Sequence, residues 1–215
     1  MRCGSVVLIA LLFIGRESLA GRDVNVPAEL DKKDENQWEY AFSTSTYLVL
    51  HGRDYANPTF VADRDWLHIE ARYNYEALKT GSIWLGYNFS VGDKLVLEVT
   101  PMFGGVFGDS TGVAPGYTLS LSYKWVELST QGEYFFDAAT RDGNFFYTWT
   151  ELSVAPVESF RLGLVIDRTK AFGSDFDIRR GPLLGFSYKK IDFTTYWLEP
   201  GSSSSAVVFA VTVNF

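Results

Sequence analysis

The sequence has little cysteine, no excess of basic charge and no long apolar segment beyond its first twenty residues. Its one cysteine, Cys3, lies within those residues, so disulfides, thiol nucleophiles and cysteine metal sites are excluded from the rest of the chain. A formal net charge of -7 gives no basic face for nucleic acid. A bundle of transmembrane helices is also excluded, because each span needs about 20 mostly apolar residues in succession.

Aromatic residues, in contrast, are abundant. The 215 residues include 17 Phe, 12 Tyr and 6 Trp, yet the mean hydropathy is close to zero. Such a chain is rich in large apolar rings without being apolar overall. A β protein remains, either a soluble sandwich or a membrane barrel.

The first residues are typical of a targeting segment. Arg2 precedes an unbroken apolar run at 6–14, and Ser18 and Ala20 place small residues before a cleavage point at Gly21. This pattern predicts a cleavable secretory signal over residues 1–20. Residues 21–37 mix acidic and basic side chains with almost no aromatics, so we expect a flexible, solvated segment there. A plug folded into a lumen is the alternative.

From Trp38 to Phe215, apolar and polar residues alternate with the period of two that marks β-strands. The clearest case is the segment 66–77, where one face would carry Leu67, Ile69, Ala71, Tyr73, Tyr75 and Ala77, and the other His68, Glu70, Arg72, Asn74 and Glu76. The same alternation continues through 82–91 and 117–125. Further strands are expected at about 38–51, 94–103, 128–137, 144–155, 161–171, 179–189, 192–198 and 206–215.

Short and long connections alternate between these strands, as expected of a transmembrane barrel with tight turns at one end and longer loops at the other. The segments above amount to eleven, whereas a single-chain bacterial barrel has an even number. A short additional strand near Thr59–Ala62 gives twelve, and ten is possible if the first segment does not span. The sequence therefore predicts an all-β, antiparallel transmembrane β-barrel over 38–215, with the glycine-rich stretch 104–116 as an outer loop.

The aromatic residues decide between barrel and sandwich. A sandwich core is built from branched aliphatic residues, whereas a barrel gathers aromatic girdles at both ends of its apolar band. Here the aromatics of the apolar faces lie near the strand ends: Tyr75, Tyr87, Phe89, Tyr117, Tyr123, Trp125, Tyr134, Phe136, Tyr188 and Trp197. This distribution favours the barrel.

The end of the chain carries a more specific pattern. Phe209, Val211, Val213 and the terminal Phe215 alternate with smaller residues. This segment resembles the C-terminal strand of bacterial outer-membrane β-barrel proteins, and the resemblance implies recognition by the barrel-assembly machinery. Residues 66–76, 100–108 and 185–195 are also similar to small, porin-like outer-membrane barrels of no assigned activity. The resemblance implies a location in the outer membrane and contact with its lipid, but brings no catalytic residues.

If the apolar face meets lipid, the opposite face lines the lumen. Parity assigns to the lumen, as candidate selectivity residues, His68, Glu70, Arg72, Glu76, Glu98, Lys124, Glu133 and Glu151, with Gln131, Asp167, Arg179 and Lys189 as further inward positions. Glutamate predominates among them, so a pore with this lining should mildly prefer cations. A closed interior held together by salt bridges is the alternative.

These observations favour a passive channel for small hydrophilic solutes or ions, acting without a cofactor or a metal. A structural or adhesive barrel is one alternative, although its outer loops would be short. An outer-membrane hydrolase is another. A serine mechanism needs a base beside the nucleophile, and only His51 and His68 are available, with no compact grouping of serine, histidine and acid around either. The sequence does not indicate an oligomeric state.

Overall fold

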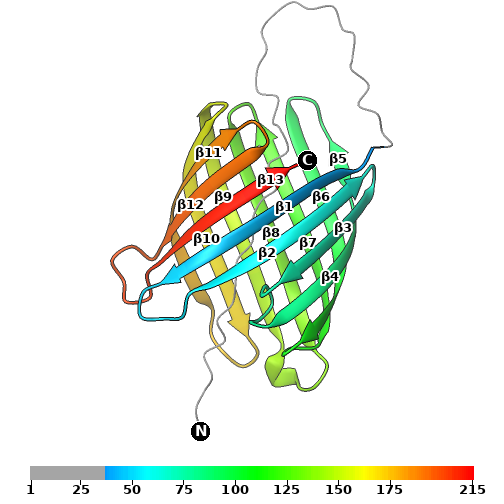
Figure 1. Cartoon of the computed structure of the whole chain (residues 1–215), viewed down its shortest axis with the longest axis vertical. Helices are drawn as coiled ribbons and strands as arrows, with labels where there is room; N and C mark the ends of the chain where they lie inside the picture. The colour runs from blue at the N-terminus through cyan, green and yellow to red at the C-terminus, as the bar shows by residue number, and fades with distance from the viewer. Residues whose placement is uncertain (1–36) are drawn as a thin grey trace, which may run out of the picture.

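The computed structural model describes residues 37–215, and these form one closed antiparallel β-barrel (Figure 1). The predicted signal, residues 1–20, lies outside the described residues, as does nearly all of the predicted flexible segment 21–37. Within the described part of the chain, no helix is long and apolar enough to cross a membrane. The elements are β1 (Glu39–Val49), β2 (Tyr55–Arg64), β3 (Leu67–Tyr73), β4 (Thr80–Tyr87), β5 (Phe89–Val91), β6 (Leu95–Gly108), β7 (Gly112–Tyr123), β8 (Val126–Asp137), the short 3-10 turn η1 (Arg141–Gly143), β9 (Phe145–Val157), β10 (Phe160–Ala171), β11 (Asp177–Tyr188), β12 (Ile191–Leu198) and β13 (Ala206–Asn214).

The wall of the barrel has twelve strands, because β4 and β5 are two parts of one strand. Both pair with β6: Gly86 lies opposite Met102, and Phe89 lies opposite Val99. The interruption is at Asn88, which lies opposite Thr100 and next to the position of Pro101, a residue that has no N–H to give to the ladder. The barrel closes where β1 pairs with β13 and β4 with β6. The twelve-strand prediction is confirmed, and the additional strand near residue 59 is the ten-residue β2.

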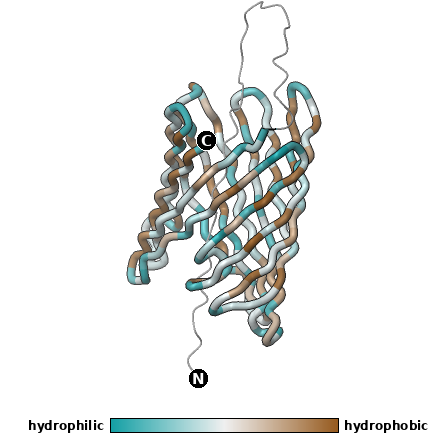
Figure 2. The backbone as a smooth tube through the Cα atoms, turned by 45° about the vertical axis from the view of Figure 1, so that its right-hand side comes forward, coloured by the Kyte–Doolittle hydropathy of each residue, from teal (hydrophilic) through white to brown (hydrophobic). Residues whose placement is uncertain are grey.

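The outer surface is apolar and the inner surface is mixed, as period-two alternation requires. On β4, Ile83 and Leu85 are 58% and 61% exposed, whereas the intervening Trp84 is completely buried. Figure 2 shows the same alternation of hydrophobic and hydrophilic residues along the strands. The barrel therefore presents a lipid-compatible exterior around a partly polar interior.

The two rims differ in the lengths of their connections. At one rim, β2–β3, β7–β8 and β11–β12 are joined by two-residue turns whose first residues, Asp65, Lys124 and Lys189, adopt positive φ angles. At the other rim, loops such as 50–54, 138–144 and 199–205 are longer. This difference assigns the long-loop rim to the outer side of the membrane. Both ends of the described chain lie at the short-turn rim.

Two predicted boundaries were wrong. The strand predicted over 66–77 ends at Tyr73, because Asn74 turns the chain with a φ of 58°. Tyr75, predicted to face lipid, is consequently only 2% exposed and lies inside. The loop predicted over 104–116 is mostly strand, since β6 continues to Gly108 and β7 begins at Gly112.

Candidate functional site

The candidate site is the interior of the barrel wall. Most of the lumen residues predicted from parity are buried there: His68, Glu70, Arg72, Glu76, Glu133 and Glu151 are each at most 6% exposed. Glu98, on β6, is partly exposed. Lys124 departs from the prediction, because it lies in the exposed β7–β8 turn with its ammonium over the ring of Tyr123. Its positive φ of 54° removes it from the alternation of the strand.

Arg72 is the centre of the larger ion-pair cluster, which we call the Arg72 cluster and which comprises Glu70, Arg72, Glu133, Tyr75 and Trp84. The guanidinium donates from Nε and Nη2 to the two oxygens of Glu70, each at 2.8 Å. Its Nη1 donates to Glu133 Oε2 at 3.1 Å. The rings of Tyr75 and Trp84 each lie 4.3 Å from the guanidinium carbon, so the charge is held by ions and aromatic faces together.

The Arg72 cluster reaches across part of the lumen. Glu133 belongs to β8, which is separated from β3 by β4, β6 and β7 around the wall. Small residues on the intervening strands make room for the contact. A Cβ at Gly104 or Gly116 would lie 2.5 Å or 2.9 Å from the indole of Trp84, so glycine lets this ring lie flat against the wall.

Two tyrosines make a second contact across the lumen. Tyr75, in the β3–β4 turn, meets Tyr147 of β9 edge to face, with ring centroids 5.9 Å apart. Strands β3 and β9 are almost opposite each other in the barrel. Together with the Arg72 cluster, this pair narrows the cross-section toward the outer rim.

A second cluster, the Glu151 cluster, lies against the wall of β9, β10 and β12. Glu151 accepts hydrogen bonds from the Trp149 indole at 2.7 Å and from the Tyr196 hydroxyl at 2.8 Å. Arg161 approaches Glu151 at 3.3 Å and donates to the Thr194 hydroxyl at 2.9 Å.

Arg161 is an interior residue that was not among the predicted lumen positions. It has the same parity as Asp167, which was assigned inward, so continuing the alternation along β10 would have found it. Asp167 is itself buried and forms an ion pair with Arg179 of the neighbouring β11. Lys189, also predicted to face inward, instead lies in the exposed β11–β12 turn, where its positive φ removes it from the alternation.

The histidines do not form the arrangement that a serine hydrolase needs. His68 contacts Asp63 Oδ1 through Nδ1 at 2.8 Å and Glu70 Oε2 through Nε2 at 3.4 Å, so carboxylates occupy both ring nitrogens. His51 lies in the exposed β1–β2 loop. No cluster of three or more histidine, cysteine or acidic side chains among residues 37–215 could hold a metal ion.

The C-terminal strand β13 completes the wall. Phe209 is 47% and Phe215 65% exposed, and the Phe215 amide donates to the Tyr40 carbonyl at 2.9 Å. Val211 and Val213 share the same face as these phenylalanines and are partly exposed. Their apolar side is thus turned to lipid while the strand pairs with β1 and β12.

A closed antiparallel wall, an apolar aromatic exterior and a charged interior define an outer-membrane-type β-barrel. Comparison with solved structures agrees on this fold. The KdgM porin superimposes with a TM-score of 0.56 at 10% identity, covering 81% of this chain and 99% of the porin. The KdgM porin in complex with disordered oligogalacturonate gives 0.53 at 8% identity, covering 81% of this chain and 98% of that one.

A further neighbour comes from work on in-meso crystallization of membrane proteins. It superimposes with a TM-score of 0.57 at 9% identity and covers 83% of each chain. No protein-family model and no curated protein matches the sequence. At these identities, the comparisons establish a porin-like fold and carry no residue-level correspondence.

Proposed function

We propose that this barrel is a passive channel of the bacterial outer membrane for small hydrophilic solutes or ions. The observation that carries the proposal is the lining: charged and hydroxyl side chains face inward from strands all around a wall whose exterior is apolar. Several buried polar atoms, including the Tyr55 and Tyr147 hydroxyls and the Gln131 amide nitrogen, have no hydrogen-bond partner within residues 37–215. Buried groups of this kind are commonly satisfied by water, which supports a hydrated interior.

The charge of the lining supports a preference for cations. Five buried carboxylates belong to Glu70, Glu76, Glu133, Glu151 and Asp167, whereas Arg72 is the one comparably buried arginine in the described chain. Arg161 and Arg179 are less deeply buried. A narrow water-filled path lined in this way carries excess negative charge, and rings of acidic side chains favour cation passage.

The fold of the neighbours supports the channel at a coarse level. Two of the solved structures that superimpose on this barrel are of the KdgM porin, one of them in complex with disordered oligogalacturonate. That ligand is acidic, whereas the interior of this chain has an excess of carboxylates. We therefore expect a different solute class here, neutral or cationic.

The decisive experiment is planar-bilayer conductance of the refolded full chain. Discrete single-channel openings are expected, and in a salt gradient the reversal potential should show cations passing more readily than anions. Glu151→Gln, which removes one interior charge, should lower this selectivity. The exposed turn variant Glu158→Gln is the matched control. Anion preference would reject the selectivity, and the absence of openings would reject the channel.

A closed, salt-bridged structural barrel is a second candidate, favoured by the contacts that cross the lumen from Arg72 to Glu133 and from Tyr75 to Tyr147. It predicts a silent wild-type barrel that begins to conduct when Arg72 is replaced. An enzymatic role has less support, because both nitrogens of His68 already contact carboxylates.

We also propose that residues 1–20 direct secretion and that β13 is read by the barrel-assembly machinery. The exposed Phe209 and Phe215 support the second point, since both rings are available on the outer face. Phe215→Ala should slow membrane assembly in cells, measured as loss of the heat-modifiable folded band, with Phe186→Ala, an exposed phenylalanine of β11, as the control.

A further inference from the structure

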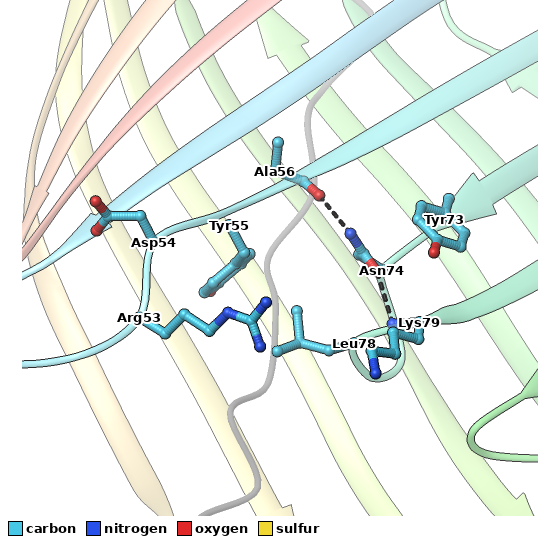
Figure 3. Close-up of a pocket in the computed structure, with 8 residues that line it drawn as sticks. All are labelled: Arg53, Asp54, Tyr55, Ala56, Tyr73, Asn74, Leu78 and Lys79. Carbon is cyan, nitrogen blue, oxygen red and sulfur yellow. Dashed lines mark hydrogen bonds between the residues drawn. The ribbon is translucent and has the colours of Figure 1, made fainter.

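The outer rim has a notch where β2 extends beyond β3. Thr59 and Arg72 form the outermost pair between these strands, so residues 55–58 of β2 pair with β1 alone. Beyond that pair, the Asn74 side-chain amide donates to the Ala56 carbonyl at 2.9 Å. A cavity of about 260 Å³ opens at this place (Figure 3), lined by Arg53, Asp54, Tyr55, Ala56, Tyr73, Asn74, Leu78 and Lys79.

The notch lies at the height of the outer aromatic girdle. Tyr73, at its edge, is 47% exposed, and Phe107 and Phe136, which also end strands at this rim, are 52% and 46% exposed. Aromatic girdles mark the level of the lipid head groups. The unpaired backbone N–H and C=O groups of an open strand edge are not stable against hydrocarbon. The part of β2 that has no neighbouring strand on this side therefore needs a polar group beside it at the level of the lipid head groups.

The notch is also electropositive. Among residues 37–215, neither Arg53 nor Lys79 forms an ion pair through its side chain. Asp54 also lines the cavity, but its carboxylate points away from the Arg53 guanidinium in Figure 3 and accepts a hydrogen bond from the Val49 amide at 3.0 Å. Lys79 is held in place by its backbone amide, which donates to Asn74 Oδ1 at 2.7 Å. Two cations thus border one polar opening.

We propose that this notch binds the phosphate of an outer-leaflet lipid head group. The Arg53 guanidinium and the Lys79 ammonium pair with the phosphate oxygens, a geometry for which both side chains are suited. The lipid chains then lie along the exposed face beside Tyr73. Lipid binding at this notch does not require conduction through the lumen, and the test below measures lipid binding alone.

The test measures the affinity of the detergent-solubilised, refolded barrel for diphosphorylated lipid A by native mass spectrometry. The double variant Arg53→Gln/Lys79→Gln should weaken binding by about tenfold or more, since each basic group near a lipid surface contributes appreciably. The charge-retaining variant Arg53→Lys/Lys79→Arg still offers the phosphate one guanidinium and one ammonium, so it should keep the affinity within roughly threefold. Heat-dependent gel mobility confirms that each variant is folded.

The matched control is Lys124→Gln/Lys189→Gln. These lysines lie in turns at the opposite rim, each with its ammonium 5.4 Å from a neighbouring tyrosine ring, and their loss should leave binding unchanged. Three results would overturn the proposal: equal losses in both double variants, equal binding of lipid A without phosphates, or displacement of the lipid by millimolar inorganic phosphate, which would assign the site to soluble anions.

Discussion

The two interior clusters contain the same kinds of groups but differ in how far they reach. The Arg72 cluster joins β3 to β8 across three intervening strands, and the Arg72 side chain is 3% exposed. The Glu151 cluster stays against the wall of β9, β10 and β12, and the Arg161 side chain is 25% exposed. In the Arg72 cluster, Gly104 and Gly116 on the intervening strands leave the room in which the Trp84 ring lies beside the guanidinium, so space as well as charge determines how far an ion pair reaches.

Of the substitutions that would remove the difference between the two clusters, replacing Arg72 should lower the stability of the barrel most. Arg72→Met leaves Glu133 without its cation and Glu70 with only the 3.4 Å contact to His68, and removal of one partner from such a buried network costs about 3–5 kcal/mol. Urea unfolding in lipid vesicles, followed by gel mobility, measures this loss. Unchanged stability would show that the cluster is already solvated.

Gly116→Ala should have the second-largest effect on the stability of the barrel. Its Cβ would lie 2.9 Å from Trp84 Cζ3 and 3.0 Å from the Gly132 carbonyl oxygen, so the indole must move off the wall and away from Arg72. Overpacking of this kind costs about 1–3 kcal/mol. The matched control is Gly105→Ala, whose Cβ meets nothing within 4 Å. Equal unfolding midpoints for the two variants would contradict the role assigned to Gly116.

Much of this architecture follows from the sequence because side-chain direction in a strand alternates with period two. That rule is enough to place Glu70, Arg72, Glu133 and Glu151 inside. It fails where the strand ends, as at Lys124 and Tyr75, because a single positive φ in or before a turn breaks the alternation.

Contacts across the lumen were beyond prediction for a different reason. Arg72 and Glu133 are 61 residues apart and lie on strands that do not pair. The alternation along each strand predicts that both side chains face inward, but it does not predict the distance between them. That distance depends on the shear of the barrel and on the room beside Trp84. The glycines that provide this room, Gly104 and Gly116, resembled loop residues in the sequence.

The protonation of Glu76 gives a third test, in which the expected effect on stability is smaller. The Arg72 cluster has an acidic neighbour, Glu76, and burial raises its pKa above the ordinary value of 4.5, although the charge of Arg72 opposes this. The folded state therefore binds the Glu76 proton more tightly than the unfolded state, and stability falls as the pH rises from about 4.5 through the raised pKa. Glu76→Gln should remove this component, making the variant more stable than wild type at neutral pH.

The measurement is the unfolding free energy of both proteins across this pH range. Their difference should grow in favour of Glu76→Gln as the pH rises and should vanish at the acidic end. Glu158→Gln, in the exposed β9–β10 turn, serves as the control and should run parallel to wild type. A difference that does not change with pH would mean that Glu76 keeps one protonation state throughout.

Replacing Arg161 should have the smallest effect, and it tests the other side of the comparison. In Arg161→Met, Glu151 keeps the Trp149 and Tyr196 donors at 2.7 and 2.8 Å, so its charge remains hydrogen-bonded. The Arg161 side chain is 25% exposed and Glu151 is fully buried, so the loss should be that of one hydrogen bond to a buried charge that keeps two other donors, about 1–2 kcal/mol. Urea unfolding under the conditions used for Arg72→Met provides the measurement. A loss as large as that of Arg72→Met would show that the buried Glu151 depends on Arg161 for compensation of its charge, and that reach across the lumen does not set the cost.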